Sequence, residues 1–177
     1  METQSPITQL SNREFFIKRW NQEYPAFIDV CSALPADKLD YRPHRGSRSA
    51  GELVALLVSV EQSCCELCTA GQTSYASGLQ WHPTTAFTPL SEMLAAYQDR
   101  HHQLATLLNA MDDMVWNRQA WLMHGKAEIL LKDTVGGLLW LALFDAVHHR
   151  GQLSTYIRPM GGKVPSIYGP SGDTPNP

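Results

Sequence analysis

Apolar residues recur every three or four positions along four segments of the chain, which is the spacing of one face of an α-helix. The first two segments open with Ser-x-x-Glu capping boxes, in which the serine and the glutamate bond each other's backbone. Pro25 interrupts the first pattern and predicts a kink or a break near residues 22–24. We expect four long helices, which begin behind Ser11, Ser49, Thr88-Pro89 and Asp133-Thr134 and end near Leu34, Ala70, Met111 and Arg158.

The segments between these helices are irregular by composition. Residues 34–46 contain the helix breakers Pro35, Pro43 and Gly46, and residues 71–88 are rich in Gly, Ser, Thr and Pro, so both segments are typical of loops. Residues 114–131 are ambiguous and suggest an extended excursion with a turn at His124-Gly125-Lys126, although no run alternates as a strand should. The pattern predicts an all-α four-helix bundle in a single domain over residues 1–177, with a core from about 11 to 160 and a C-terminal tail from 161 to 177.

Composition and charge exclude several classes of protein. The 177 residues are 44% hydrophobic and 18% charged, close to the average of a globular domain. The net charge of −3 gives no basic excess for nucleic acid or an anionic membrane. The N-terminus has no secretory signal, and the longest apolar run, residues 135–144, is about half of a membrane span. We expect a cytoplasmic protein without nucleic-acid or membrane partners.

Three of the four cysteines lie close together in the second helix. Cys65 and Cys68 form a C-x-x-C pair, a spacing seen in redox and metal sites, with Cys64 beside them. The pair lies late in its helix, where the helix dipole disfavours a thiolate, and no second C-x-x-C completes a zinc site. We interpret these cysteines as small buried hydrophobes.

A polar stripe in the last helix carries the candidate chemistry. Asp145 and His149 are four residues apart, so their side chains converge on one helix face. A carboxylate and an imidazole at this spacing suit a divalent metal ion, and they equally suit a plain hydrogen bond. The stripe either faces solvent or faces the interior, and its apolar neighbours favour the interior. Further residues of this helix are candidates for contact with a small-molecule ligand: His148, Arg150, Gln152 and Tyr156.

Two residues outside the last helix could complete a metal site. His101 lies on the apolar face of the third helix and is either a third ligand or a core histidine with a hydrogen-bond partner. Glu61 lies on the second helix, and we expect it to be solvated or ion-paired. Arg150 is more readily an ion-pairing or anion-contacting group than a ligand.

Four motifs resemble one known family. They are residues 39–44, 48–53, 148–158 (HHRGQLSTYIR) and 163–171 (KVPSIYGPS). They resemble the DinB family, which belongs to the DinB/YfiT-like metalloenzyme superfamily. The resemblance implies a four-helix bundle with long crossover connections, a homodimer, and a divalent metal, often nickel or zinc, held by three histidines. Members include bacillithiol S-transferases and a mycothiol-dependent isomerase.

Two of the family's three ligand positions differ in this chain. The last histidine of the family matches His149, but its partner four residues earlier falls on Asp145, and the second-helix histidine falls on Leu56. Two hypotheses follow from the resemblance. The chain is a metal-dependent transferase for a small thiol or electrophilic metabolite, with His149, Asp145 and His101 as ligands. Alternatively, it is a metal-free small-ligand-binding or stress-response protein with a degenerate site.

Overall fold

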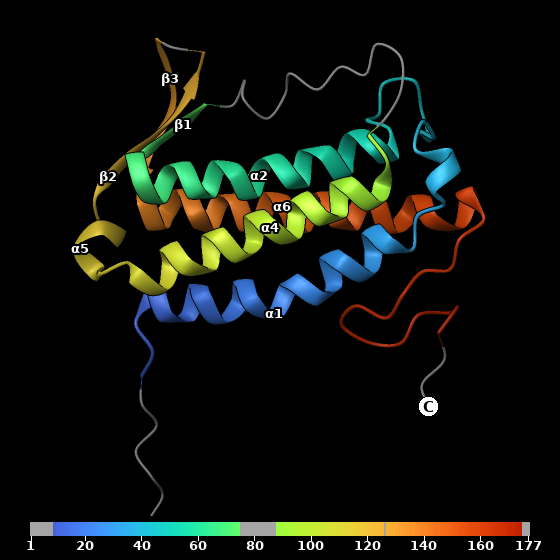
Figure 1. Cartoon of the computed structure of the whole chain (residues 1–177), viewed down its shortest axis with the longest axis horizontal. Coiled ribbons are helices and arrows are strands. Elements are labelled where there is room, and N and C mark those ends of the chain that lie inside the picture. Colours follow the sequence, from blue (N-terminus) through green and yellow to red (C-terminus); the bar gives the residue numbers. More distant parts are fainter. Residues whose placement is uncertain (1–8, 75–87, 126, 175–177) are drawn as a thin grey trace, which may run out of the picture.

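Four long helices form the body of the protein in a computed structural model, which describes residues 9–74, 88–125 and 127–174 (Figure 1). Their bounds are α1 Asn12–Ser32, α2 Ala50–Ala70, α4 Leu90–Ala110 and α6 Val135–Met160. Two short helical segments, a 3₁₀ turn at Ala36–Lys38 and α5 at Asp113–Trp116, lie in the connections. The predicted helical segments are therefore confirmed.

The order and direction of the helices require long connections. Figure 1 shows that α2 and α4 run in the same direction, while α1 and α6 run in the opposite one. The end of α2 and the start of α4 consequently lie at opposite ends of the bundle. Helix α2 packs against α4 and α6, and α1 packs against α4 and α6. This is the predicted four-helix bundle with crossover connections.

The first two helix starts form as predicted. The Ser11 hydroxyl accepts a hydrogen bond from the Glu14 backbone N–H, and the Glu14 carboxylate accepts one from the Ser11 backbone N–H. The same pair of bonds joins Ser49 and Glu52 at the start of α2. Each box provides acceptors for two backbone N–H groups that the helix itself leaves unpaired, so these starts are fixed by local sequence.

One expectation about prolines needs correction. Helix α1 continues through Pro25, so the break is wrong, and α6 continues through Pro159 to end before Gly161 at φ +92°. Thr88 does not cap α4, which starts at Leu90 behind Pro89 without a side-chain cap. A proline removes one backbone donor, and tertiary packing outweighs that loss in long helices.

A small sheet covers one end of the bundle. Strand β1 (Gln72–Ser74) pairs in parallel with β2 (Gln119–His124), which pairs antiparallel with β3 (Glu128–Thr134). The predicted excursion is present, with Gly125 of its turn at φ +61° and Lys126 outside the described residues, but the expectation of no strands is wrong. Nearly all of β3 is exposed, so its sequence lacks the alternation that burial of one face imposes. Residues 75–87 of the predicted connection lie outside the described residues.

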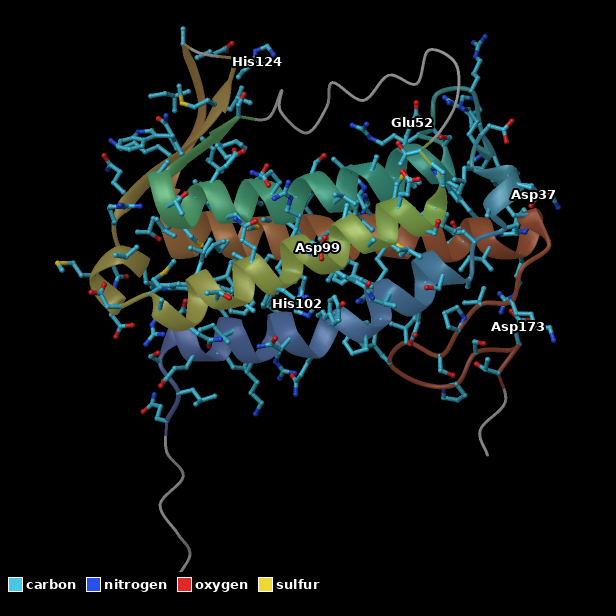
Figure 2. All side chains as sticks on the ribbon, viewed as in Figure 1. Asp37, Glu52, Asp99, His102, His124 and Asp173 are labelled. Atoms are coloured by element: carbon cyan, nitrogen blue, oxygen red, sulfur yellow. The ribbon has the colours of Figure 1, made fainter. Side chains whose placement is uncertain are left out.

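The core divides into two apolar clusters along the bundle. One gathers around Leu53 and Ile157 near the connection between α1 and α2, and the other around Leu104 and Leu139 near the sheet. Charged side chains such as Asp99 project outward from α4 (Figure 2). Among the described helices only α2 is long and apolar enough to cross a membrane, and core helices of soluble proteins meet the same criteria.

The start of α6 is fixed by close contact with an aromatic ring. A Cβ atom on Gly136 would overlap the ring of Trp116, so only glycine allows the helix to come this close. The Thr134 hydroxyl accepts from the Gly137 N–H and caps the same turn. These contacts set the rotation of α6, and therefore the direction in which its polar stripe faces.

Candidate functional site

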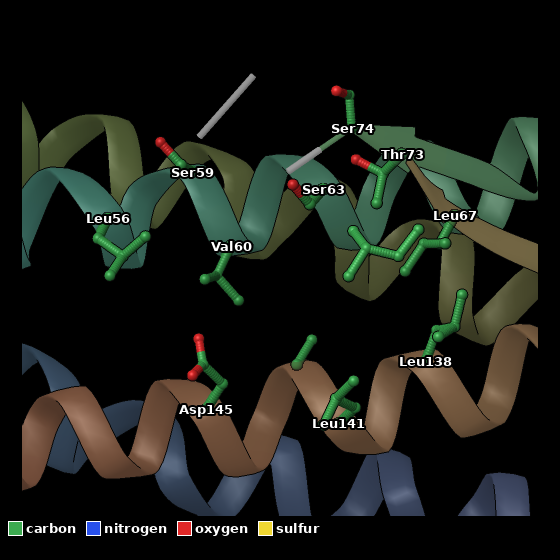
Figure 3. A pocket seen from close by; sticks show the side chains of 12 residues that line it. Leu56, Ser59, Val60, Ser63, Leu67, Thr73, Ser74, Leu138, Leu141 and Asp145 are labelled. Atoms are coloured by element: carbon green, nitrogen blue, oxygen red, sulfur yellow. The ribbon is translucent and has the colours of Figure 1, made fainter. Parts of the chain in front are cut away.

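A cleft of about 220 Å³ lies between α2 and α6 and is closed at one end by the sheet (Figure 3). Its walls are mostly apolar and come from all three elements: Leu56, Val60, Leu67, Leu122, Leu138, Leu141 and Ala142. Its polar groups are four hydroxyl side chains and one carboxylate: Ser59, Ser63, Thr73, Ser74 and Asp145. A concave apolar site with few polar groups is the usual form of a small-molecule site.

Asp145 is the only charged group among the described residues that line the cleft. Figure 3 shows its carboxylate pointing from α6 toward α2, where Leu56 and Val60 project into the same space. The Asp145 side chain is 51% exposed, so this end of the predicted interior stripe borders an open cleft rather than a closed core; the other polar residues of the stripe do not line the cleft.

Asp145 begins a hydrogen-bonded chain along the surface of α6. Its Oδ2 lies 3.4 Å from Nε2 of His149, and Nδ1 of His149 lies 3.0 Å from Oε1 of Gln152. Nε2 of Gln152 lies 3.0 Å from Nε2 of His148, which is exposed. Both nitrogens of His149 therefore face oxygen acceptors, an arrangement that a doubly protonated imidazole satisfies.

The electrostatics of the pair agree with that protonation state. The hydrogen bond to Asp145 raises the pKa of His149 above its ordinary value, although partial burial opposes the shift. The same hydrogen bond lowers the pKa of Asp145, and the nearby charges of His148 and Arg48 act in the same direction. The structure thus favours a carboxylate beside an imidazolium.

This pair makes the stability of the fold depend on pH. The Asp145–His149 coupling is expected to be greatest between their ordinary pKa values, about 3.9 and 6.5. It is lost as pH rises through the raised pKa of His149 and as pH falls through the lowered pKa of Asp145. Because Asp145 is half exposed, we expect a coupling free energy between the two side chains of roughly 0.3–0.5 kcal/mol at about pH 5.5 and almost none at about pH 9.

A double-mutant cycle with Asp145→Asn and His149→Gln measures this coupling by urea unfolding at both pH values. The exposed pair His124–Glu128 in the hairpin provides a matched control for an i, i+4 contact. Equal coupling of Asp145 and His149 at the two pH values would contradict the ionic description of the pair.

His101 lies in the core rather than at the cleft. Its ring is stacked between Trp20 and Tyr24, with centroids 3.8 Å away on each side. Its Nδ1 lies 3.3 Å from Oε1 of Glu61. Glu61 faces the His101 imidazole and is only 5% exposed, so the solvated alternative is wrong.

Arg150 connects α6 to α1 and to the C-terminal loop. It is 2% exposed, and it donates to Oε2 of Glu23 at 2.6 Å and to the Tyr168 hydroxyl. Its guanidinium carbon lies 4.7 Å from the centre of the Phe27 ring. These contacts occupy the side chain and direct it away from the cleft.

Tyr156 is also engaged away from the cleft. It is buried, and its hydroxyl donates to the backbone carbonyl of Arg48 at 3.2 Å. Of the four predicted ligand-contacting residues, His148 and Gln152 belong to the chain of hydrogen bonds that starts at Asp145, whereas Arg150 and Tyr156 have structural partners.

The cysteines agree with their interpretation as buried hydrophobes. All four are free and buried. Burial raises the pKa of Cys65 to about 11 and of Cys31 and Cys68 to about 12, and it raises that of Cys64 well above its ordinary value. Thiols with such pKa values are neutral at physiological pH and are poor nucleophiles and metal ligands.

Sequence reasoning missed the part of the cleft that α2 contributes. Leu56, Ser59, Ser63 and Leu67 line it in steps of three or four, so they form a stripe opposite that of α6. The small hydroxyl side chains at positions 59 and 63 were the available signal, because small residues on a buried helix face leave space.

The donor set does not fit the family's metal site. Within residues 9–74, 88–125 and 127–174, no three His, Cys, Asp or Glu side chains lie close enough to hold a metal ion. His101 pairs with Glu61, Leu56 offers no donor, and both nitrogens of His149 are hydrogen-bonded. A metal ligand must be a deprotonated group with a free lone pair, and these three positions do not provide such a set.

Solved structures with this fold include DinB-like proteins. The DinB-like protein YjoA of Bacillus subtilis is 20% identical, with TM-score 0.65 over 88% of this chain and 98% of its own. YfiT of Bacillus subtilis, described as a probable metal-dependent hydrolase with an unusual four-helix bundle topology, is 19% identical, with TM-score 0.66 over 90% and 95%. A mycothiol-dependent maleylpyruvate isomerase is 9% identical, with TM-score 0.59 over 97% and 68%.

The sequence itself identifies the family. No curated protein matches the chain. The DinB family matches residues 8–176, which include all four motifs and both helices that border the cleft. Because the match spans most of its length, the chain belongs to the DinB family.

Proposed function

We propose that this DinB-family chain binds a small, largely apolar molecule in the cleft between α2 and α6, without a metal ion at the family's histidine positions. The observation that carries the proposal is the cleft itself, in which Leu56 and Asp145 occupy two of those positions and line one space. The chain is therefore better described by the metal-free hypothesis than by the metal-dependent transferase.

The lining of the cleft suggests the chemistry of its ligand. Sites for drug-sized ligands measure roughly 300–1,000 Å³, and this cleft, at about 220 Å³, suits a smaller molecule. Leucine and valine side chains would contact an apolar body. The Asp145 carboxylate accepts hydrogen bonds and repels anions, which favours a ligand end that carries a hydroxyl or an ammonium group.

Relatives support a small-molecule role without specifying a reaction. YfiT is described as a probable hydrolase, and the mycothiol-dependent protein is an isomerase. Proteins with this fold are therefore assigned different reactions, as expected when function depends on the side chains in a site rather than on the fold. The predicted homodimer and the predicted cytoplasmic location stay predictions.

The binding test uses 1-hexanol as the probe and ligand-observed NMR as the measurement. Ser63→Trp fills the cleft from α2 and is expected to weaken binding at least tenfold, which corresponds to about 1.4 kcal/mol. Ser91→Trp adds the same side chain to the exposed surface of α4 and is expected to leave the affinity unchanged. Equal affinity of Ser63→Trp and the parent protein would overturn the proposal.

A further inference from the structure

A buried carboxylate lies directly behind the cleft. Glu61 is 5% exposed, and its Oε1 accepts from Trp20 Nε1 at 3.3 Å and faces His101 Nδ1 at 3.3 Å. Its Oε2 is fully buried and has no hydrogen bond of standard length with any residue that the structure describes, although the Tyr97 hydroxyl lies near this carboxylate. A buried carboxylate oxygen without a partner is costly, so it calls for a hydrogen-bond donor.

The environment of that oxygen can accept one small polar group. Glu61 and Tyr97 line an internal cavity of about 20 Å³, and roughly 10–15 Å³ is enough for one water-sized group. Burial and the nearby Glu61 carboxylate raise the pKa of Tyr97 well above its ordinary value, so its hydroxyl stays protonated. The cavity thus combines an anionic acceptor with a neutral hydroxyl, inside walls that are otherwise apolar apart from the Trp20 N–H.

The cavity and the cleft are neighbours. Val60 of α2 and Ala142 of α6 line both spaces, so these two side chains form the partition between them. Figure 3 shows Val60 projecting into the gap between the two helices. Val60 is only partly buried, and alanine is the smallest side chain with a Cβ, so the wall that the two spaces share consists of two short side chains.

We propose that the cleft has an inner polar subsite at Glu61, which binds the hydroxyl or ammonium end of the ligand while the apolar body remains between α2 and α6. This inference rests on the proposed function and adds the orientation and the class of the ligand. Asp145 lies at the open cleft and Glu61 behind the partition, so a primary amine or alcohol on an unbranched apolar chain of a few carbons fits the site.

Three probes of equal chain length test the subsite: hexylamine, 1-hexanol and hexanoate. The parent protein is expected to prefer hexylamine over hexanoate. Glu61→Gln keeps an acceptor for Trp20 and His101 but removes the charge, and it is expected to reduce this preference at least fivefold. Asp145→Asn is the matched control for a carboxylate at the cleft, and it is expected to reduce the preference less.

A second measurement locates the end of the probe directly. Nuclear Overhauser effects are expected between the methylene next to the hexylamine nitrogen and the Tyr97 ring. Val60→Leu narrows the partition and is expected to remove these effects; because Val60 also lines the cleft, the affinity of this variant for 1-hexanol is measured alongside. This variant also provides the test if Glu61→Gln does not fold.

The outcomes separate the two proposals. Suppose that Ser63→Trp blocks binding, but Glu61→Gln keeps the preference for hexylamine over hexanoate and the probe shows no contact with Tyr97. The proposal of the inner subsite is then wrong, and the proposal that the cleft binds a ligand remains. If Ser63→Trp does not weaken binding of any probe, both proposals are wrong. Contact of the probe with Tyr97, lost in Val60→Leu, supports the subsite.

Discussion

Replacing Arg150 with alanine is expected to lower the free energy of unfolding by about 3–5 kcal/mol, because it removes one partner of a buried ion pair. Glu23, with 17% of its side chain exposed, would lose its cationic partner, and Phe27 would lose the guanidinium above its ring. For a chain of this size, that loss lowers the melting temperature by roughly 6–20 °C. Urea unfolding and calorimetry measure the two quantities.

Arg158→Ala is the matched control for this change. Arg158 lies on the same helix and pairs with Asp173 at 2.8 Å, but 57% of its side chain is exposed. Exposed pairs are worth about 0–1 kcal/mol, so this variant is expected to stay close to the parent protein. If both substitutions cost the same, Arg150 does not connect α1, α6 and the C-terminal loop as described.

Restoring the family's histidines is expected to give the protein a metal site. In the variant Leu56→His/Asp145→His, two new imidazoles would border the cleft, and with the neighbouring His149 they make a set of three. Removing the Asp145 carboxylate also removes the main cause of the raised pKa of His149, which favours a neutral imidazole with Nε2 free to bind. Nickel at 100 times its dissociation constant stabilises the folded state by about 2.7 kcal/mol.

Elemental analysis after purification without metal-chelating resin measures the metal content, and thermal unfolding with added nickel or EDTA measures the stabilisation. Leu56→Ala/Asp145→Asn is the control, since it changes the same positions without adding ligands. The parent protein and this control are expected to show no shift in melting temperature. A stoichiometric metal ion in the parent protein, with a shift equal to that of the histidine variant, would contradict the metal-free proposal.

Helical phase predicted what lies on one face of a helix but not what lies opposite. Asp145 and His149 were placed together correctly, because residues four apart share a face by helix geometry alone. His101 was correctly placed on an apolar face, yet that face packs against α1 and α2 around Glu61. Which helix faces which depends on tertiary packing, and this information is not contained in the periodicity of one segment.

The burial of charged side chains was the second feature that could not be predicted from the sequence. Arg150 and Glu61 look like ordinary surface residues in sequence, since charged groups are seldom fully buried without a partner. Their partners, Glu23 and His101, are 127 and 40 positions away. The sheet was missed for a related reason, because an exposed strand such as β3 bears no hydrophobic alternation.

The parallel pairing of β1 with β2 has a consequence for how the binding site forms. Thr73 and Leu122 both line the cleft and are register partners, although they lie far apart in the sequence. Contacts between such distant positions close slowly, because the entropy of the intervening loop is lost before any packing is gained. Helices α2 and α6 alone would form an open trough. The binding site is therefore a property of the completely folded chain, and a folding intermediate with all four helices formed would not yet hold a ligand.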